Sequence, residues 1–195
     1  MDRRDFTRRV GWALGSLGLM PGAWAPQGRT SLRVNGPRLN QTLGRLGRIG
    51  LNPATGGINR LAFSDADRDA REYVTDLMRA ARLDVTVDAA ANLIGRRPGR
   101  DAALPPLMFG SHIDSVPEGG NFDGPVGSLA AIEVAQTLAD HGAVTRHPLE
   151  VVIFANEENG KTGSRAMSGE VEARELDLVT ASGKSIRDGM AFLGG

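Results

Sequence analysis

Acidic residues and a histidine gather in two short segments of this sequence. Residues 110–124 read GSHIDSVPEGGNFDG, and residues 154–160 read FANEENG. Imidazole and carboxylate groups bind divalent metal ions, and a carboxylate beside such an ion can accept a proton and return it. The side chains that qualify are His112, Asp114, Asp123, Glu157 and Glu158.

The spacing of His112 and Asp114 suits a histidine that binds a metal. Residues two apart in an extended chain point to the same side, so Asp114 can accept the N–H of one ring nitrogen and leave the other for the ion. Several carboxylates at the ends of buried strands repel one another unless a cation binds. We therefore expect Asp123 and the Glu157–Glu158 pair to provide oxygen ligands and a base.

Composition excludes several other kinds of site. The 195 residues contain no cysteine, which rules out disulfides, iron–sulfur clusters and thiol nucleophiles. Lys plus Arg and Asp plus Glu both number 23, so there is no basic excess for nucleic acid or an anionic membrane. Of the three histidines, His141 is expected to cap a helix and His147 to lie in a surface loop.

The first 25 residues have the features of an export signal. Arg3 and Arg4 precede an apolar run from Val10 to Met20, and a small-x-small end follows at residues 23–25. This pattern predicts export through the twin-arginine pathway, to the periplasm or beyond. The run is shorter than the roughly 20 apolar residues of a membrane span. Residues 26–37 read as a linker, which leaves residues 38–195 for the folded part.

Helical and strand patterns alternate after the linker. Helices are expected over residues 38–49, from Ser64 onward, and over residues 126–141. The last of these helices should direct a core face inward, made of Leu129, Ala130, Val134 and Leu138. Strands are expected over residues 85–87, 92–95, 107–109 and 149–155. The apolar runs 107–109 and 149–155 indicate strands buried on both faces. We predict an α/β fold, a three-layer sandwich around a mixed sheet. Both acidic segments then follow carboxyl ends of strands, where open α/β sheets bind ligands.

The same segments resemble a known enzyme family. Residues 110–134 resemble the first metal motif of the zinc-dependent amidohydrolases of the hydantoinase/N-carbamoyl-L-amino-acid hydrolase family, which includes allantoate amidohydrolases, and residues 154–160 resemble its Glu-Glu motif. Residues 58–64 and 92–96 resemble its N-terminal segments. The run GGNF before Asp123, where related desuccinylases and dipeptidases carry Gly-Arg-Gly, favours the carbamoylase branch.

The resemblance implies a role for each candidate residue. His112 binds a first metal ion, Asp123 bridges two ions, Glu158 binds the second, Glu157 is general base and then acid, and Asp114 orients His112. The implied cofactors are two divalent ions, Zn²⁺ or alternatively Mn²⁺, Co²⁺ or Ni²⁺, which lower the pKa of water and polarise the substrate carbonyl. The implied substrate is a small N-carbamoyl amino acid or ureido compound, hydrolysed at its C–N bond.

Parts of the family pattern are not found in this sequence. Members use two further histidines, one in a His-Ile-Glu-Gln-Gly-type motif, whereas no histidine follows Glu158 here. The lid domain, through which family members form homodimers, and the last strands of the catalytic sheet also find no match. We therefore expect a truncated zinc-peptidase-like catalytic domain that is inactive as this chain alone.

Two other kinds of protein remain open as hypotheses. In the first, the chain is a non-catalytic exported remnant that binds metal weakly or serves as a partner for another chain. In the second, it is a nucleotide-binding protein. Residues 155–162 differ by one glycine from a phosphate-binding P-loop, but a pair of glutamates there would repel phosphate. A serine hydrolase is disfavoured, because Ser111 lacks the nucleophile-elbow pattern.

Overall fold

The structure, a computed structural model, describes residues 31–195, so the expected export signal lies outside the described residues and stays a prediction. None of the helices in this part of the chain combines the length and the apolar character that crossing a membrane requires. The elements are, in chain order, α2 (Gly36–Leu46), α3 (Asp65–Ala80), β1 (Asp84–Val87), β2 (Leu93–Arg97), β3 (Leu107–His112), α4 (Pro125–Asp140), β4 (Leu149–Phe154), α5 (Thr162–Met167), the 3-10 helix η1 (Ala173–Asp177) and α6 (Ile186–Phe192).

Four strands form one mixed sheet in the order β1-β2-β4-β3. β1 and β2 are the expected hairpin, with Val85 opposite Gly95. β2 pairs antiparallel with β4, and β4 pairs parallel with β3. The mixed sheet and its helices confirm the α/β fold class that the alternating patterns predicted.

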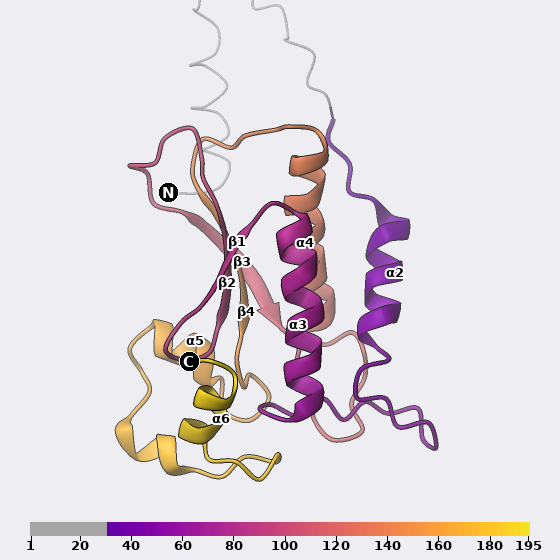
Figure 1. Ribbon diagram of the computed structural model, residues 1–195, viewed down its shortest axis with the longest axis vertical. Coiled ribbons are helices and arrows are strands. Elements are labelled where there is room, and N and C mark those ends of the chain that lie inside the picture. Colours follow the sequence, from indigo (N-terminus) through magenta and orange to yellow (C-terminus); the bar gives the residue numbers. More distant parts are fainter. Residues whose placement is uncertain (1–30) are drawn as a thin grey trace, which may run out of the picture. The chain divides into compact units, whose positions relative to one another are not determined.

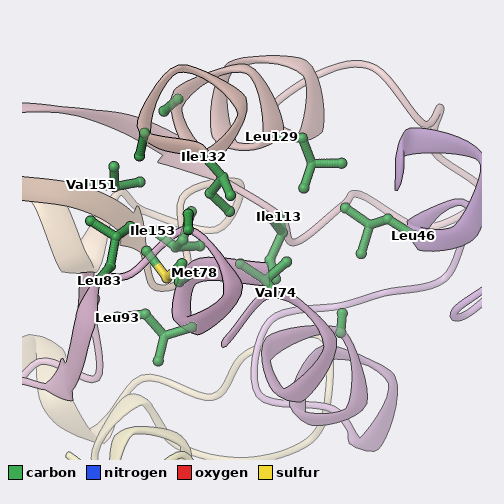
Figure 2. Packing of buried hydrophobic residues seen from close by; sticks show 14 of the residues in the cluster. Leu46, Val74, Met78, Leu83, Leu93, Ile113, Leu129, Ile132, Val151 and Ile153 are labelled. Atoms are coloured by element: carbon green, nitrogen blue, oxygen red, sulfur yellow. The ribbon is translucent and has the colours of Figure 1, made fainter. Parts of the chain in front are cut away.

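Helices α2, α3 and α4 lie together on one side of the sheet (Figure 1). The main core fills the space between them and the strands. Figure 2 shows side chains of this cluster from α3, α4 and the two inner strands, among them Met78, Ile132 and Val151. Val151 and Val152 of β4, whose side chains point to opposite faces of the sheet, are 0% and 1% exposed, so this strand is covered on both faces, as expected.

Local capping explains where the first two helices begin. The Asn35 side chain accepts the N–H of Arg38 at the start of α2, and Pro37 lies in its first turn, where a missing N–H leaves no donor unpaired. Helix α2 therefore starts two residues before the expected position. Ser64 caps α3 as predicted, by accepting the N–H of Asp67 at 3.2 Å.

The prediction that β3 is buried on both faces is wrong. Leu107 and Met108 are 52% and 43% exposed, because β3 is the edge strand and only one face of the sheet carries the long helices. Across the opposite face, Met108 borders an open groove of about 600 Å³ that Ile94 and Met167 also line. Near the lower end of the sheet in Figure 1, this side carries α5 and α6.

The core face of α4 also differs from the sequence expectation. Leu129 is buried, but Val134 is 40% exposed while its neighbours Ile132 and Ala135 are buried. Helix α4 contacts β3 and β4 on one side and α2 and α3 on the other. A helix enclosed from several directions does not need a single apolar stripe, so the periodicity did not identify its exposed face.

A bidentate ion pair joins α2 to α4. Arg38 donates from Nε to Glu133 Oε2 at 2.7 Å and from Nη2 to Oε1 at 2.8 Å, and the Glu133 side chain is 4% exposed. Burial acts to raise the pKa of Glu133, but hydrogen bonds from Arg38, the Asn35 N–H and Thr137 outweigh it and lower that pKa below its ordinary value. The pair therefore stabilises the fold when Glu133 is ionised.

We expect Arg38→Gln to lower the free energy of unfolding by about 2 kcal/mol at pH 7, because it leaves a buried carboxylate without its cation. The folded-state pKa of Glu133 lies below the unfolded one, so its stabilisation is complete above about pH 4.5 and is lost as the pH falls through the folded-state value. The difference between wild type and variant should shrink in acid, as measured by urea denaturation at several pH values.

Arg79→Gln is the matched control, because Arg79 pairs with Asp76 at 3.8 Å and both side chains are largely exposed. Its effect should stay within about 0.5 kcal/mol. An equal loss in both variants would contradict the importance of the buried pair.

Candidate active site

The two acidic segments meet at one edge of the sheet because β3 and β4 are parallel neighbours. His112, the last residue of β3, is in register with Phe154, the last residue of β4. The strand expected over residues 107–109 continues to His112. Gly110 permits this close pairing, since a Cβ there would lie 1.8 Å from the backbone oxygen of Val152. His112 therefore projects from the sheet itself and not from a loop.

The carboxylate of Asp114 contacts both segments. It is 2% exposed, and its two oxygens accept the backbone N–H groups of Glu157 at 3.3 Å and Glu158 at 3.1 Å. Nδ1 of His112 lies 3.4 Å from Asp114 Oδ1 and 3.2 Å from the Asp114 backbone oxygen. Asp114 thus holds the imidazole on one side and the loop after β4 on the other.

The second ring nitrogen of His112 faces two further carboxylates. Nε2 lies 3.7 Å from Glu157 Oε2 and 3.9 Å from Asp123 Oδ1. Burial acts to lower the pKa of His112, but the hydrogen bond with Asp114 and the negative charges of Asp114 and Glu157 raise it above its ordinary value. An imidazole nitrogen directed at carboxylates is a donor set that suits Zn²⁺ or Mn²⁺.

Glu158 lies in the same electrostatic environment. Burial raises its pKa, and the charges of Asp123, Asp114 and Glu157 raise it further, whereas His112 opposes the rise. A cation at this place would relieve that repulsion. As they stand, no three His, Asp or Glu side chains in the described part of the chain converge closely enough to hold a metal ion. The donor types fit a divalent metal, but the described residues form only part of a coordination shell.

The face of the His112 ring is covered by Gly124. This residue has φ +80°, and a Cβ built on it would lie 2.5–2.6 Å from three atoms of the imidazole. Only glycine combines that backbone conformation with that approach. The loop after Asp123 can therefore fold closely over the histidine.

A buried arginine supports the His112–Asp114 segment from behind, and the sequence reasoning did not identify it. Arg60 is fully buried and donates from Nε to Ile113 O at 2.5 Å and from Nη1 to Leu46 O and Ile49 O at 3.1 and 2.9 Å. Its backbone N–H donates to Ser115 Oγ at 3.1 Å. Only the resemblance of residues 58–64 to a family segment pointed toward this position.

The other two histidines lie apart from this cluster. Nδ1 of His141 is 2.8 Å from Thr137 O at the end of α4, and Nδ1 of His147 is 2.9 Å from Pro105 O. His141 is the C-cap residue of α4, as the sequence predicted. His112 is thus the histidine that the fold brings to the carboxylates.

The geometry of residues 155–162 disfavours the P-loop alternative. A phosphate cradle needs several free backbone N–H groups directed at one point. Here the N–H groups of Glu157 and Glu158 donate to Asp114, and those of Gly160 and Lys161 donate to the Glu157 backbone oxygen. These donors are already used within the protein.

Comparison with known proteins finds amidohydrolases. The sequence model of Peptidase family M28 matches residues 92–182. An N-carbamoyl-L-amino acid amidohydrolase of Geobacillus stearothermophilus is 45% identical over 166 residues, which are 83% of this chain and 40% of that protein. A ureidoglycolate hydrolase of Arabidopsis thaliana is 34% identical over 160 residues, 82% of this chain and 33% of that protein.

The solved structures agree with the sequence comparison. The crystal structure of a hydantoinase/carbamoylase family amidase from Burkholderia ambifaria superposes with a TM-score of 0.78 at 40% identity, over 84% of this chain and 42% of that one. The chain thus spans about 40% of the length of the first relatives it matches.

We expect Gly124→Ala to displace the His112 ring and to lower the free energy of unfolding by about 1–3 kcal/mol, through the clash and the unfavourable φ. Nuclear magnetic resonance of the imidazole signals and chemical denaturation measure the two effects. Gly120→Ala is the matched control in the same loop, because a Cβ there meets nothing within 4 Å. A Gly124→Ala variant with unchanged imidazole signals would contradict the close contact.

Proposed function

Because the chain belongs to the hydantoinase/carbamoylase family of amidases, we propose that it contributes part of a metal-dependent site that hydrolyses amide or carbamoyl C–N bonds. One observation carries the proposal. The Asp114 carboxylate holds His112 and the Glu157–Glu158 loop together, so that the free ring nitrogen of His112 faces the carboxylates of Glu157 and Asp123.

Three side chains would hold metal in this proposal. They are His112, Asp123 and Glu158, an imidazole and two carboxylates whose donor types suit Zn²⁺, Mn²⁺, Co²⁺ or Ni²⁺. A bound divalent ion supplies Lewis acidity, which lowers the pKa of water and polarises the carbonyl of the scissile bond. Asp114 keeps its contact with Nδ1 of His112, which leaves Nε2 as the nitrogen available to the ion.

Glu157 is proposed as the proton carrier. Its side chain is 27% exposed and faces Nε2 of His112 at 3.7 Å, so water and substrate can reach it. Glu157 accepts a proton as the water oxygen bonds to the substrate carbonyl carbon. It returns this proton to the leaving nitrogen as the C–N bond breaks.

The proposed substrate class is a small linear compound with a carbamoyl or ureido group. The names of the relatives refer to N-carbamoyl-L-amino acids and to ureidoglycolate, which share a carbamoyl nitrogen next to a carbon that bears a carboxylate. Hydrolysis of the carbamoyl group ends in ammonia, carbon dioxide and an amine.

Metal binding tests the ligand assignment. Titration calorimetry with Mn²⁺ or Zn²⁺ on the 195-residue chain should show binding that His112→Ala weakens by more than about tenfold, since a ligand matters at least as much as a supporting residue. His141→Ala and His147→Ala are matched controls that lie outside the cluster and should leave the affinity unchanged. Equal effects of all three substitutions would refute the assignment.

Hydrolysis is tested in a chimera of the Geobacillus stearothermophilus relative that carries this chain in place of its matching segment. The chimera should release ammonia from N-carbamoyl-L-amino acids, and Glu157→Gln should slow this release by about 10²- to 10⁴-fold. Glu170→Gln, at an exposed position shortly after α5, should not slow it. This chain alone is expected to release none, because two metal ions need about four ligands each.

A folded, metal-loaded chimera without turnover would contradict the proposal and favour the non-catalytic remnant. Turnover by the isolated chain that Glu157→Gln abolishes would keep the chemistry and overturn only the expected inactivity.

A further inference from the structure

The loop that carries the two glutamates has a narrow base. This Glu-Glu loop, residues 156–162, follows β4 and ends with the first residue of α5. At its base, Gly163 N donates to Ala155 O at 2.8 Å. Within the loop, Asn156 and Lys161 have φ of +52° and +55°. Asparagine tolerates this left-handed conformation, but it is unfavourable for lysine, so surrounding contacts must hold Lys161 in it.

A side chain from the turn between β1 and β2 joins the two ends of this loop. Asn92 is fully buried. Its Oδ1 accepts the backbone N–H of Ala155 at 3.0 Å, and its Nδ2 donates to the backbone oxygen of Gly163 at 3.1 Å. One amide group thus contacts the residue before the Glu-Glu loop and the residue after it.

The amide of Asn92 is itself fixed in orientation. Its Nδ2 donates a second hydrogen bond to Asp88 Oδ2 at 2.9 Å, and Asp88 Oδ1 accepts the backbone N–H of Asn92 at 2.8 Å. A Cβ at Gly163 would lie 2.0 Å from Asn92 Oδ1, so the backbone of Gly163 packs directly on the amide. Every polar atom of the Asn92 side chain has a partner, and exchanging oxygen and nitrogen would break these contacts.

We propose that Asn92 is a positioning residue that closes the base of the Glu-Glu loop and thereby directs Glu157 and Glu158 toward His112. The loop then has two supports: Asp114 binds its N–H groups at the front, and Asn92 clamps its ends at the back. The expected effect of Asn92 on metal binding rests on the proposed function. Its expected effect on the conformation of the loop does not.

The test uses a pair of isosteric exchanges in the full chain. Asn92→Asp keeps the acceptor for Ala155 N–H but replaces both donors, so a carboxylate oxygen faces Gly163 O and the Asp88 carboxylate. Adding Asp88→Asn supplies a donor to that carboxylate and restores the contact within the turn. In the double variant the contact with Gly163 O is therefore the one that stays disrupted, because a carboxylate oxygen faces this carbonyl oxygen in place of the amide donor.

Two measurements report on the loop. Hydrogen exchange of the Glu157 and Glu158 amides, relative to the Ile153 amide in β4, should rise at least about tenfold in both variants, since these N–H groups open with the loop. Mn²⁺ affinity should fall about tenfold or more. Met78→Ala is the control: it removes a fully buried side chain of the core and should lower overall stability without changing the exchange ratio.

Restoration of wild-type loop exchange in the double variant would show that Asn92 acts only through its own turn and would overturn the proposal. Unchanged exchange in both variants would do the same. If Asn92→Asp alone does not fold, the double variant decides the question, because its turn contact is intact. If wild type binds no Mn²⁺, the proposed function fails while hydrogen exchange still tests the role of Asn92.

Discussion

The parallel pairing of β3 with β4 is the constraint on which the candidate site depends. It brings together the carboxyl ends of two strands that a whole helix separates in sequence, and it does so closely enough that Gly110 has no room for a side chain. Asp114 then faces the first turn after β4, where two backbone N–H groups lack partners within the strand. A carboxylate that accepts hydrogen bonds from those two N–H groups and from an imidazole N–H has partners for its oxygens, so it can be buried away from water.

The acidic residues of the candidate site differ widely in how far they are exposed to solvent. Asp114 is 2% exposed, Glu157 is 27% exposed and Asp123 is 88% exposed. Asp114 is enclosed by donors and suits a supporting role, whereas Glu157 has both a neighbour in the site and access to solvent. The raised pKa of Glu158 reflects burial together with the carboxylates around it. These different environments support the different tasks proposed for chemically similar groups.

Several charged and polar side chains are buried beneath the site, at positions where apolar side chains usually pack. Arg60 donates to three backbone oxygens, and Asn92 joins the ends of another loop. Burial also raises the pKa of Asp67 to about 6, against the nearby charge of Arg71. Such groups add little to stability compared with apolar side chains. Their directional hydrogen bonds instead specify how the irregular segments lie.

The sequence alone determined the features that depend on neighbours along the chain. Ser64 begins α3, the β1–β2 hairpin forms where alternation predicted it, and the apolar run of β4 marks a strand covered on both faces. Residue type and spacing also pointed to His112 and the carboxylates, which the structure brings near one another; the roles assigned to them stay a proposal. The exposed face of β3 and the exposed Val134 of α4 were not readable, since an apolar residue does not reveal which side receives a neighbour.

Only the tertiary structure decided which segments meet. Arg60 and Asn92 are polar residues that a sequence places at the surface by default, and their burial follows from backbone oxygens and N–H groups that distant segments bring to them. Likewise, the sequence placed residues 110–124 and 154–160 after the carboxyl ends of strands, but it did not predict that these two strands are directly paired, parallel neighbours. Strand order depends on pairing between distant parts of the chain, and that pairing is selected by the packing of the whole domain.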